Sequence, residues 1–140
     1  MSNTYSENII ANNRFSHSDR LNKKKDIERL FKDSKTFRTP KLRVQYKFSD
    51  DSSNSSPCEL LISVPKRKHP KAVKRNKIKR LIREAWRKHK SGLYQALQKK
   101  NIHLQVAIIF FSDEIPDYSE IESKIILTLQ HLTNTSLKSQ

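Results

Sequence analysis

Glycine and cysteine are almost absent from this sequence, which contains one residue of each. A single glycine excludes the glycine-rich loops whose backbone amides cradle phosphates. A single cysteine, Cys58, excludes an intramolecular disulfide and a zinc site built from cysteines. Because Cys58 lies in the apolar run CELLISV, we expect a buried and chemically inert thiol.

Long hydrophobic runs are also missing. A membrane-spanning helix needs about 20 consecutive, mainly apolar residues, and no segment of the sequence approaches that length. The N-terminal stretch MSNTYSENIIANNRFSHSD has no apolar segment of the kind found in secretory signals. We therefore expect a cytoplasmic chain with no membrane partner.

Side chains suited to catalysis or metal binding are scattered rather than clustered. None of the five histidines stands at a metal-ligand spacing from another. The acidic pairs Asp50-Asp51 and Asp113-Glu114 fall in expected loops, where turn formation is their usual role. A protein-only nuclease would need clustered carboxylates for its metal ions, so we predict no catalytic residue and no metal ligand in the protein itself.

Positive charge is abundant. The 140 residues include 29 Lys and Arg against 14 Asp and Glu, giving a net charge of +15 and a pI near 10.1. A compact chain with this excess repels itself, and a polyanionic partner relieves the repulsion. Nucleic acid is the leading expectation, and the composition fits a ribosomal or chromatin-like role equally well.

The first half of the chain predicts one helix and two strands. Asn22 is placed to cap a helix with Ile27, Leu30 and Phe31 on one face, ending before Thr39-Pro40. Strict alternation over residues 42–48 predicts a half-buried strand. A polar loop over 49–57 and an apolar strand over 58–64 follow, and two strands around such a loop favour an antiparallel pair.

The second half predicts a long helix, a strand and a final helix. The long helix runs over 71–90 or on to 100, with Pro70 suited to its first turn and Gly92 able to end or kink it. The apolar run 103–111 predicts a central strand covered on both faces. A last helix starts at Asp117 or Ser119 and presents a regularly spaced apolar stripe of Ile121, Ile125, Leu129 and Leu132.

This order of elements predicts an α+β sandwich, one sheet with helices packed against it. We expect residues 1–18 to form a flexible tail, 19–135 a single RNA-binding domain, and 136–140 a short C-terminal tail.

The basic segment from Lys66 to Lys90 holds 13 Lys and Arg and one acid, Glu84, which is expected to pair with Arg80 or Lys88 four residues away. An apolar stripe should anchor its helix on the sheet: Ile78, Leu81, Ile82, Ala85 and Trp86. The opposite face carries Asn76, Lys79, Arg80, Arg83, Arg87 and Lys90. An anchored row of cations spaced about one turn, ~5.4 Å, apart can neutralise several phosphates of one strand.

The segment from Ala72 to Glu84, AVKRNKIKRLIRE, resembles the signature of the ribonuclease P protein family, with Lys77 where a second Arg is usual. The preceding SVPKR resembles that family's strand-to-loop element, with His69-Pro70 in place of a glycine-containing turn. Arg20-Leu21 followed by DIERLF resembles its N-terminal helix, with Ile27 at a position that is often aromatic. The resemblance spans about residues 20–132; a ribosomal RNA-binding protein is the alternative.

The resemblance implies a ferredoxin-like two-layer sandwich with an antiparallel or mixed sheet and a left-handed βαβ crossover. It implies a protein subunit that binds a catalytic RNA and precursor tRNA, while that RNA and its Mg²⁺ ions hydrolyse the phosphodiester at the tRNA 5′ end. The residues expected to contact the catalytic RNA, with Arg87 added from the helix geometry, are Lys66, Arg67, Lys68, Lys74, Arg75, Asn76, Lys77, Lys79, Arg80, Arg83 and Arg87.

The resemblance also implies a cleft between the sheet and the first helix that holds the single-stranded 5′ leader of precursor tRNA. Ile27, Phe31 and Tyr46 are the candidates there. Aromatic side chains on a sheet surface can stack on unpaired bases. Phe31 and Tyr46 also lie on apolar stripes, so the sequence leaves open whether they line the cleft or belong to the core.

Overall fold

A computed structural model describes residues 19–49 and 56–138. In chain order its elements are α2 (Lys24–Lys32), β1 (Lys35–Thr39), β2 (Leu42–Ser49), β3 (Cys58–Ser63), α3 (Ala72–His89), α4 (Ser91–Lys100), β4 (His103–Phe110) and α5 (Tyr118–Lys138). The strands form one mixed sheet of order β1-β2-β4-β3. The α+β sandwich expected from the sequence is confirmed.

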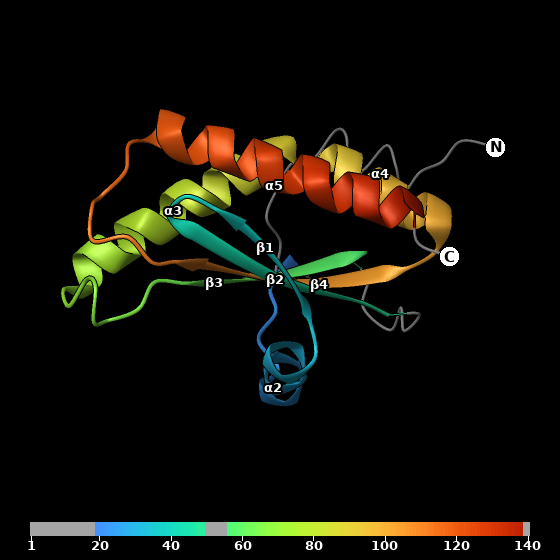
Figure 1. Cartoon of the computed structure of the whole chain (residues 1–140), viewed down its shortest axis with the longest axis horizontal. Helices are drawn as coiled ribbons and strands as arrows, with labels where there is room; N and C mark the ends of the chain where they lie inside the picture. Colours follow the sequence, from blue (N-terminus) through green and yellow to red (C-terminus); the bar gives the residue numbers. More distant parts are fainter. Residues whose placement is uncertain (1–18, 50–55, 139–140) are drawn as a thin grey trace.

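The sheet separates two groups of helices. Helices α3, α4 and α5 lie over one face, and α2 lies alone against the other (Figure 1). The larger core fills the space beneath α3, α4 and α5, and its biggest fully buried side chains include Trp86, Tyr94 and Phe110. A smaller cluster of Leu21, Leu30 and Ala107 lies beneath α2. Because α2 is a single short helix, this face of the sheet is less completely covered.

Strand β4 occupies the centre of the sheet, as its apolar sequence predicts, and seven of its eight residues are buried. It pairs antiparallel with β2 and parallel with β3. The expected antiparallel pair between residues 42–48 and 58–64 is therefore wrong. A polar loop indicates only that two strands follow one another along the chain, not that they pair. The most apolar strand takes the centre of the sheet, because burial on both faces stabilises it most.

Strand β1 was not expected, since the first helix was predicted to end just before Thr39-Pro40. Instead, α2 ends at Lys32, and residues 35–39 pair antiparallel with β2. The two strands are joined by Pro40 and Lys41, and Lys41 adopts a positive φ of 74°. The sequence KTFRT has one apolar residue, so no alternation marks it, and its extended conformation depends on pairing with β2.

The helix ends differ from the expected ones in several places. The N-cap of α2 is Lys23 rather than Asn22, with no side-chain cap. Helix α3 begins at Ala72 after Lys71, so Pro70 precedes the helix instead of forming its first turn. The helix does not continue to residue 100, because Lys90 separates α3 from α4. The break falls before Gly92, which lies inside α4 with open space where a Cβ atom would project.

Helix α5 follows the prediction closely. Its start is marked by Asp117, whose carboxylate accepts a hydrogen bond of 2.8 Å from the Glu120 amide. Its predicted apolar stripe is fully buried. The helix extends to Lys138, and Ser136 is buried, so residues 136–138 are helical rather than a tail. The expected tail over 1–18 and the pair Asp50-Asp51 lie outside the described residues.

Candidate nucleic-acid interface

Helix α3 is anchored as its sequence predicts. Ile78, Ile82, Ala85 and Trp86 are buried, and Leu81 packs at the edge of the same core. On the opposite side, Asn76 and Arg80 are exposed, while Lys79 and Arg83 are half-buried. Lys74 and Lys77 are exposed at the N-terminal end of the helix. The buried stripe fixes the orientation of α3, so these cations have defined positions on the surface.

The loop before α3 is held by a buried histidine. Nε2 of His69 lies 2.8 Å from the carbonyl oxygen of Ser112, and the His69 and Phe110 ring centroids are 5.9 Å apart. Lys66 and Arg67 are exposed on this loop, and Lys68 lies 3.4 Å from Asp113. The predicted basic loop is thus continuous with the basic side of α3. We call the exposed and half-buried polar set the basic surface: Lys66, Arg67, Lys74, Asn76, Lys77, Lys79, Arg80 and Arg83.

Arg75 has a structural role that its motif does not reveal. Its guanidinium donates hydrogen bonds to the carbonyl oxygens of His69 at 3.0 Å and of Pro70 at 2.7 Å. These bonds tie the first turn of α3 to the preceding loop. Arg75 therefore shapes the basic surface, with part of its hydrogen-bonding capacity already used within the protein.

Arg87 forms an ion pair within α3. Its Nε and one terminal nitrogen donate to Glu84 at 2.9 and 2.6 Å. This hydrogen bonding lowers the pKa of Glu84 and raises that of Arg87. Glu84 thus forms the expected pair within the helix, but with Arg87 three residues away instead of Arg80 or Lys88. The pair partly neutralises Arg87, which weakens it as a candidate for phosphate binding.

Lys90 was expected on the outer face of α3, but its side chain is buried. It lies 3.1 Å from the carboxylate of Asp19, which reaches it from the segment before α2. A helical wheel cannot predict that Lys90 is buried in this way, because Asp19 is 71 residues away in sequence. The same segment brings Arg20 close enough to Arg83 for its charge to lower the Arg83 pKa, after the larger effect of desolvation. No periodic pattern in the sequence places Arg20 beside this surface.

The three residues predicted for the leader cleft divide between the two faces of the sheet. Phe31 is 41% exposed on α2, and Ile27 packs beside it against the small cluster. Tyr46 is 4% exposed and belongs to the core beneath α5, where its hydroxyl lies 3.3 Å from His131 Nε2. Of the two alternatives that the sequence left open for Tyr46, the structure favours the core. Side chains of β2 point alternately to the two faces of the sheet, and the sequence does not indicate which face α2 covers.

The strand register identifies the β2 residues that do share the face of α2. Gln45 pairs with Ala107, which belongs to the small cluster, so Gln45 and its alternate neighbour Arg43 point to that side. Gln45 donates to the Ser34 hydroxyl at 3.3 Å. Within the described chain, its Oε1 atom and the Nε atom of Arg43 are buried without a hydrogen-bond partner. Buried polar atoms without a partner are uncommon, and bound water or a ligand can supply the missing hydrogen bonds.

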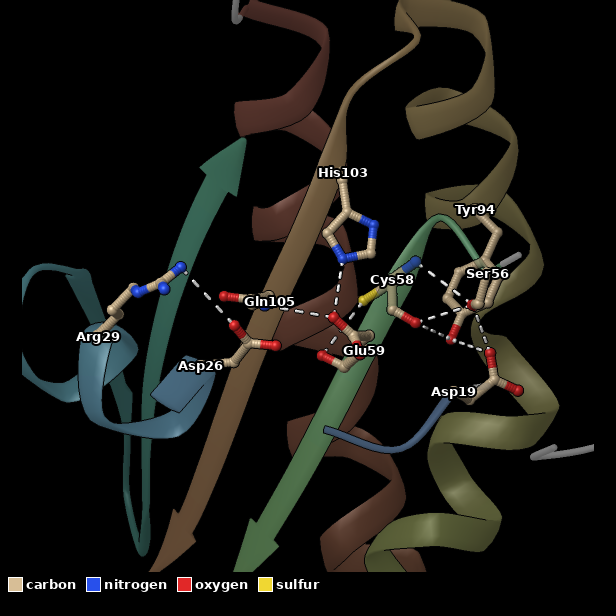
Figure 2. Close-up of polar contacts among 9 residues, drawn as sticks. All are labelled: Asp19, Asp26, Arg29, Ser56, Cys58, Glu59, Tyr94, His103 and Gln105. Carbon is tan, nitrogen blue, oxygen red and sulfur yellow. Dashed lines mark hydrogen bonds and ion pairs between the residues drawn. The ribbon is translucent and has the colours of Figure 1, made fainter. Parts of the chain in front are cut away.

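Buried polar groups also occur around β3. Glu59 lies between His103 and Gln105, with contacts of 3.0 and 3.2 Å, and Asp19 lies beside Ser56 and Tyr94 (Figure 2). Burial raises the pKa of the Cys58 thiol well above its ordinary value, which agrees with the inert thiol expected from the sequence. Among residues 19–49 and 56–138, no group of three or more His, Cys, Asp or Glu is arranged to hold a metal ion. None of the helices in these ranges is long and apolar enough to cross a membrane.

Comparisons with known proteins point to one family. The family model described as Ribonuclease P matches residues 15–131. A ribonuclease P protein component from Porphyromonas gingivalis is 33% identical over 129 residues, covering 89% of this chain and 93% of that protein. One from Chlorobium phaeobacteroides is 29% identical over 126 residues, covering 84% and 86%.

Solved structures agree with the sequence matches. The ribonuclease P protein from Thermotoga maritima superposes with a TM-score of 0.64 at 22% identity, covering 80% of this chain and 96% of that one. The protein from Staphylococcus aureus gives a TM-score of 0.56 at 25% identity, covering 84% and 94%. The mixed four-stranded sheet and its helices are therefore an architecture shared with these proteins.

Proposed function

The chain belongs to the ribonuclease P protein family, and from this premise we propose that it binds the catalytic RNA and the 5′ leader of precursor tRNA. Family membership makes it a subunit of an endoribonuclease complex that processes tRNA. In the proposal, the two RNA contacts use different faces of the molecule. The cytoplasm, where tRNA precursors are made, is the corresponding proposed location.

The observation that carries the proposal is the two-sided character of α3. Its apolar side is buried in the core, and its outer side presents the basic surface. Phosphates that bind to fixed cations release their counterions, which favours binding and makes it dependent on salt. Asn76 adds a neutral donor and acceptor that can reach a phosphate, a 2′-hydroxyl or a base edge. We assign the catalytic RNA to this surface.

We assign the leader to the opposite face, between α2 and the sheet. Phe31 offers a partly exposed ring, and Ile27 supports it from within the small cluster. Arg43 and Gln45 are half-buried polar side chains on the neighbouring strand. A single strand can use such a combination by stacking a base on the ring while polar groups bind its backbone or edges.

In this proposal the RNA and its Mg²⁺ ions carry out the hydrolysis, as the family resemblance implies. The protein contributes binding energy: it holds the leader and reduces the repulsion between two polyanions. That contribution matters most at low Mg²⁺, where fewer divalent ions screen the phosphates.

Reconstitution tests the proposal directly. Purified protein is mixed with its cognate catalytic RNA and a precursor tRNA at low Mg²⁺, and release of the 5′ leader is followed. We expect the protein to stimulate cleavage, and Lys79→Ala/Arg80→Ala to stimulate less than a charge-matched Lys99→Ala/Lys100→Ala control on α4. Failure of the wild-type chain to stimulate would contradict the proposal and favour another RNA partner, such as ribosomal RNA.

A further inference from the structure

The segment before α2 is fixed to the protein by a buried carboxylate. Asp19 is 4% exposed and accepts hydrogen bonds from the Ser56 hydroxyl at 2.6 Å and the Tyr94 hydroxyl at 3.1 Å (Figure 2). Its second oxygen lies 3.1 Å from Nζ of Lys90, which is 3% exposed. Burying two charges costs free energy even when they pair, so an ion pair in this position suggests a need for a defined geometry more than for stability.

A second anchor follows two residues later. Leu21 is 2% exposed in the small cluster, and its amide donates to the Leu60 carbonyl oxygen at 2.9 Å. Between the anchors, Arg20 forms a parallel bridge with Leu60 at the outer edge of β3. Arg20 itself is exposed. Its backbone is therefore held on both sides while its side chain is accessible to solvent.

The direction of the Arg20 side chain follows from this pairing. Paired residues of neighbouring strands point to the same face, and Leu60 points into the core beneath α3. Arg20 thus extends toward the α3 side of the sheet. Arg83 precedes Lys90, the helical C-cap of α3, by seven residues, so the two side chains differ by only about 20° around the helix axis. Asp19 lies against Lys90 at the C-terminal end of α3. From there the segment before α2 runs toward the N-terminal end of α3, which brings Arg20 toward Arg83.

We propose that Arg20 and Arg83 together bind one phosphate of the RNA partner, and that the Asp19–Lys90 ion pair is the positioning device that holds Arg20 there. The proposal rests on the RNA-binding function proposed above. Two guanidinium groups on adjacent elements repel each other, and a phosphate between them turns the repulsion into attraction. Each guanidinium can also donate two parallel hydrogen bonds to one phosphate. The effect of Arg20 on the Arg83 pKa agrees with this proximity.

The first test measures binding of the cognate catalytic RNA to Arg20→Ala, Arg83→Ala and the double variant over a range of salt concentrations. Lys100→Ala is the control, because it removes one exposed charge at the far end of α4. We expect each single variant to bind about tenfold more weakly and with a salt dependence reduced by about one released ion. The double variant should lose less than the product of the two single effects, since both residues serve one phosphate.

The second test concerns the ion pair. Asp19→Asn alone leaves Lys90 buried without its counter-charge and can unfold the protein, so we use the double variant Asp19→Asn/Lys90→Met. It should keep the wild-type circular dichroism spectrum and bind RNA about as weakly as Arg20→Ala. Adding Arg20→Ala to this variant should cause little further loss. A purely structural ion pair would instead leave RNA binding unchanged and leave the effect of Arg20→Ala at its full size.

The outcomes separate this inference from the function on which it rests. Wild-type protein that fails to bind the catalytic RNA overturns both. Wild-type protein that binds, with Arg20→Ala indistinguishable from Lys100→Ala, overturns the phosphate site alone. Strictly multiplicative effects of Arg20→Ala and Arg83→Ala would show that the two residues bind separate groups.

Discussion

Two aromatic side chains that look alike in the sequence have different environments. Phe31 lies on α2 with 41% of its surface exposed, whereas Tyr46 is almost completely buried beneath α5. Tyr46 also contacts Phe48 and His131 edge to face, at centroid distances of 5.9 Å. Tyr46 is buried because α5 covers its side of β2, and the position of α5 depends on residues far away in the chain.

This contrast predicts opposite effects of substitution. Tyr46→Ala should lower the free energy of unfolding by about 3–5 kcal/mol, as expected for a large buried ring. Phe31→Ala should lower it by about 1 kcal/mol or less, while reducing the binding of precursor tRNA only when a leader is present. Chemical denaturation and binding assays with leader-bearing and leaderless substrates check both points. Equal binding loss for the two substrates would remove Phe31 from the leader site.

The burial of Lys90 could not be predicted from the sequence pattern. Its position on the helical wheel matches that of the outer cations, and its charge suggests exposure. It is nevertheless buried, because Asp19 supplies a counter-charge from a distant segment. Long-range partners of single charged residues leave no periodic signal, so neither Asp19 nor the role of Arg20 could be predicted from the pattern of the chain.

At the scale of elements, periodicity predicted those parts whose burial is regular. Strands β2 and β4 and helices α3 and α5 carry uninterrupted apolar patterns, and all four are found close to their expected bounds. Strand β1 has no such pattern, and the order of strands in the sheet depends on competition between strands for the central position. The basic side of α3 could be predicted because it lies opposite the apolar stripe. The face proposed for the leader could not, because the pairing of β2 with β4 is needed to identify which residues of β2 point to it.

The contact between α3 and α5 predicts a dependence of stability on pH. His89 Nε2 on α3 lies 2.9 Å from Glu122 on α5, and the Tyr118 hydroxyl donates to the same carboxylate at 3.2 Å. The hydrogen bond from His89 is the main reason that the pKa of Glu122 lies below its usual 4.5. A carboxylate with a lowered folded-state pKa stabilises the fold above its unfolded pKa, and this contribution is lost as pH falls through the folded value.

Glu122→Gln should therefore be less stable than wild type near neutral pH, and the difference should shrink as the pH falls below about 4.5. Thermal denaturation across the acid range measures it. Glu28→Gln is a matched control, because it removes the same charge from an exposed position on α2. A stability difference that stays constant or grows toward low pH would contradict this account of the contact.

For the whole molecule, the excess of positive charge is the dominant electrostatic feature. With a net charge of +15, the folded chain repels itself more than the expanded chain does. Salt shortens the range of this repulsion from about 10 Å at 0.1 M to about 3 Å at 1 M. The stability of the free protein should therefore depend on ionic strength even where no specific ion binds.

We expect the Tm of the free protein to rise as sodium chloride is increased from about 0.05 to 0.5 M. Differential scanning fluorimetry measures the rise. A Lys74→Gln/Lys77→Gln variant, which removes two exposed charges from the basic surface, should start from a higher Tm in low salt and gain less from added salt. A Tm that falls over this range would show that specific ion pairs outweigh the general repulsion.

The central position of β4 also has a consequence for how the protein is made. Within the part of the chain that the structure describes, β3 forms its ladder with β4, which follows it by some forty residues along the chain. As the ribosome adds residues from the N-terminus, the hairpin of β1 and β2 can form early, but the sheet cannot close until residues 103–110 have emerged. The basic segment that joins β3 to β4 is thus synthesised before its supporting sheet exists. Nascent chains arrested with residues 103–110 still inside the ribosomal exit tunnel should therefore be much less resistant to protease than chains arrested after these residues have emerged.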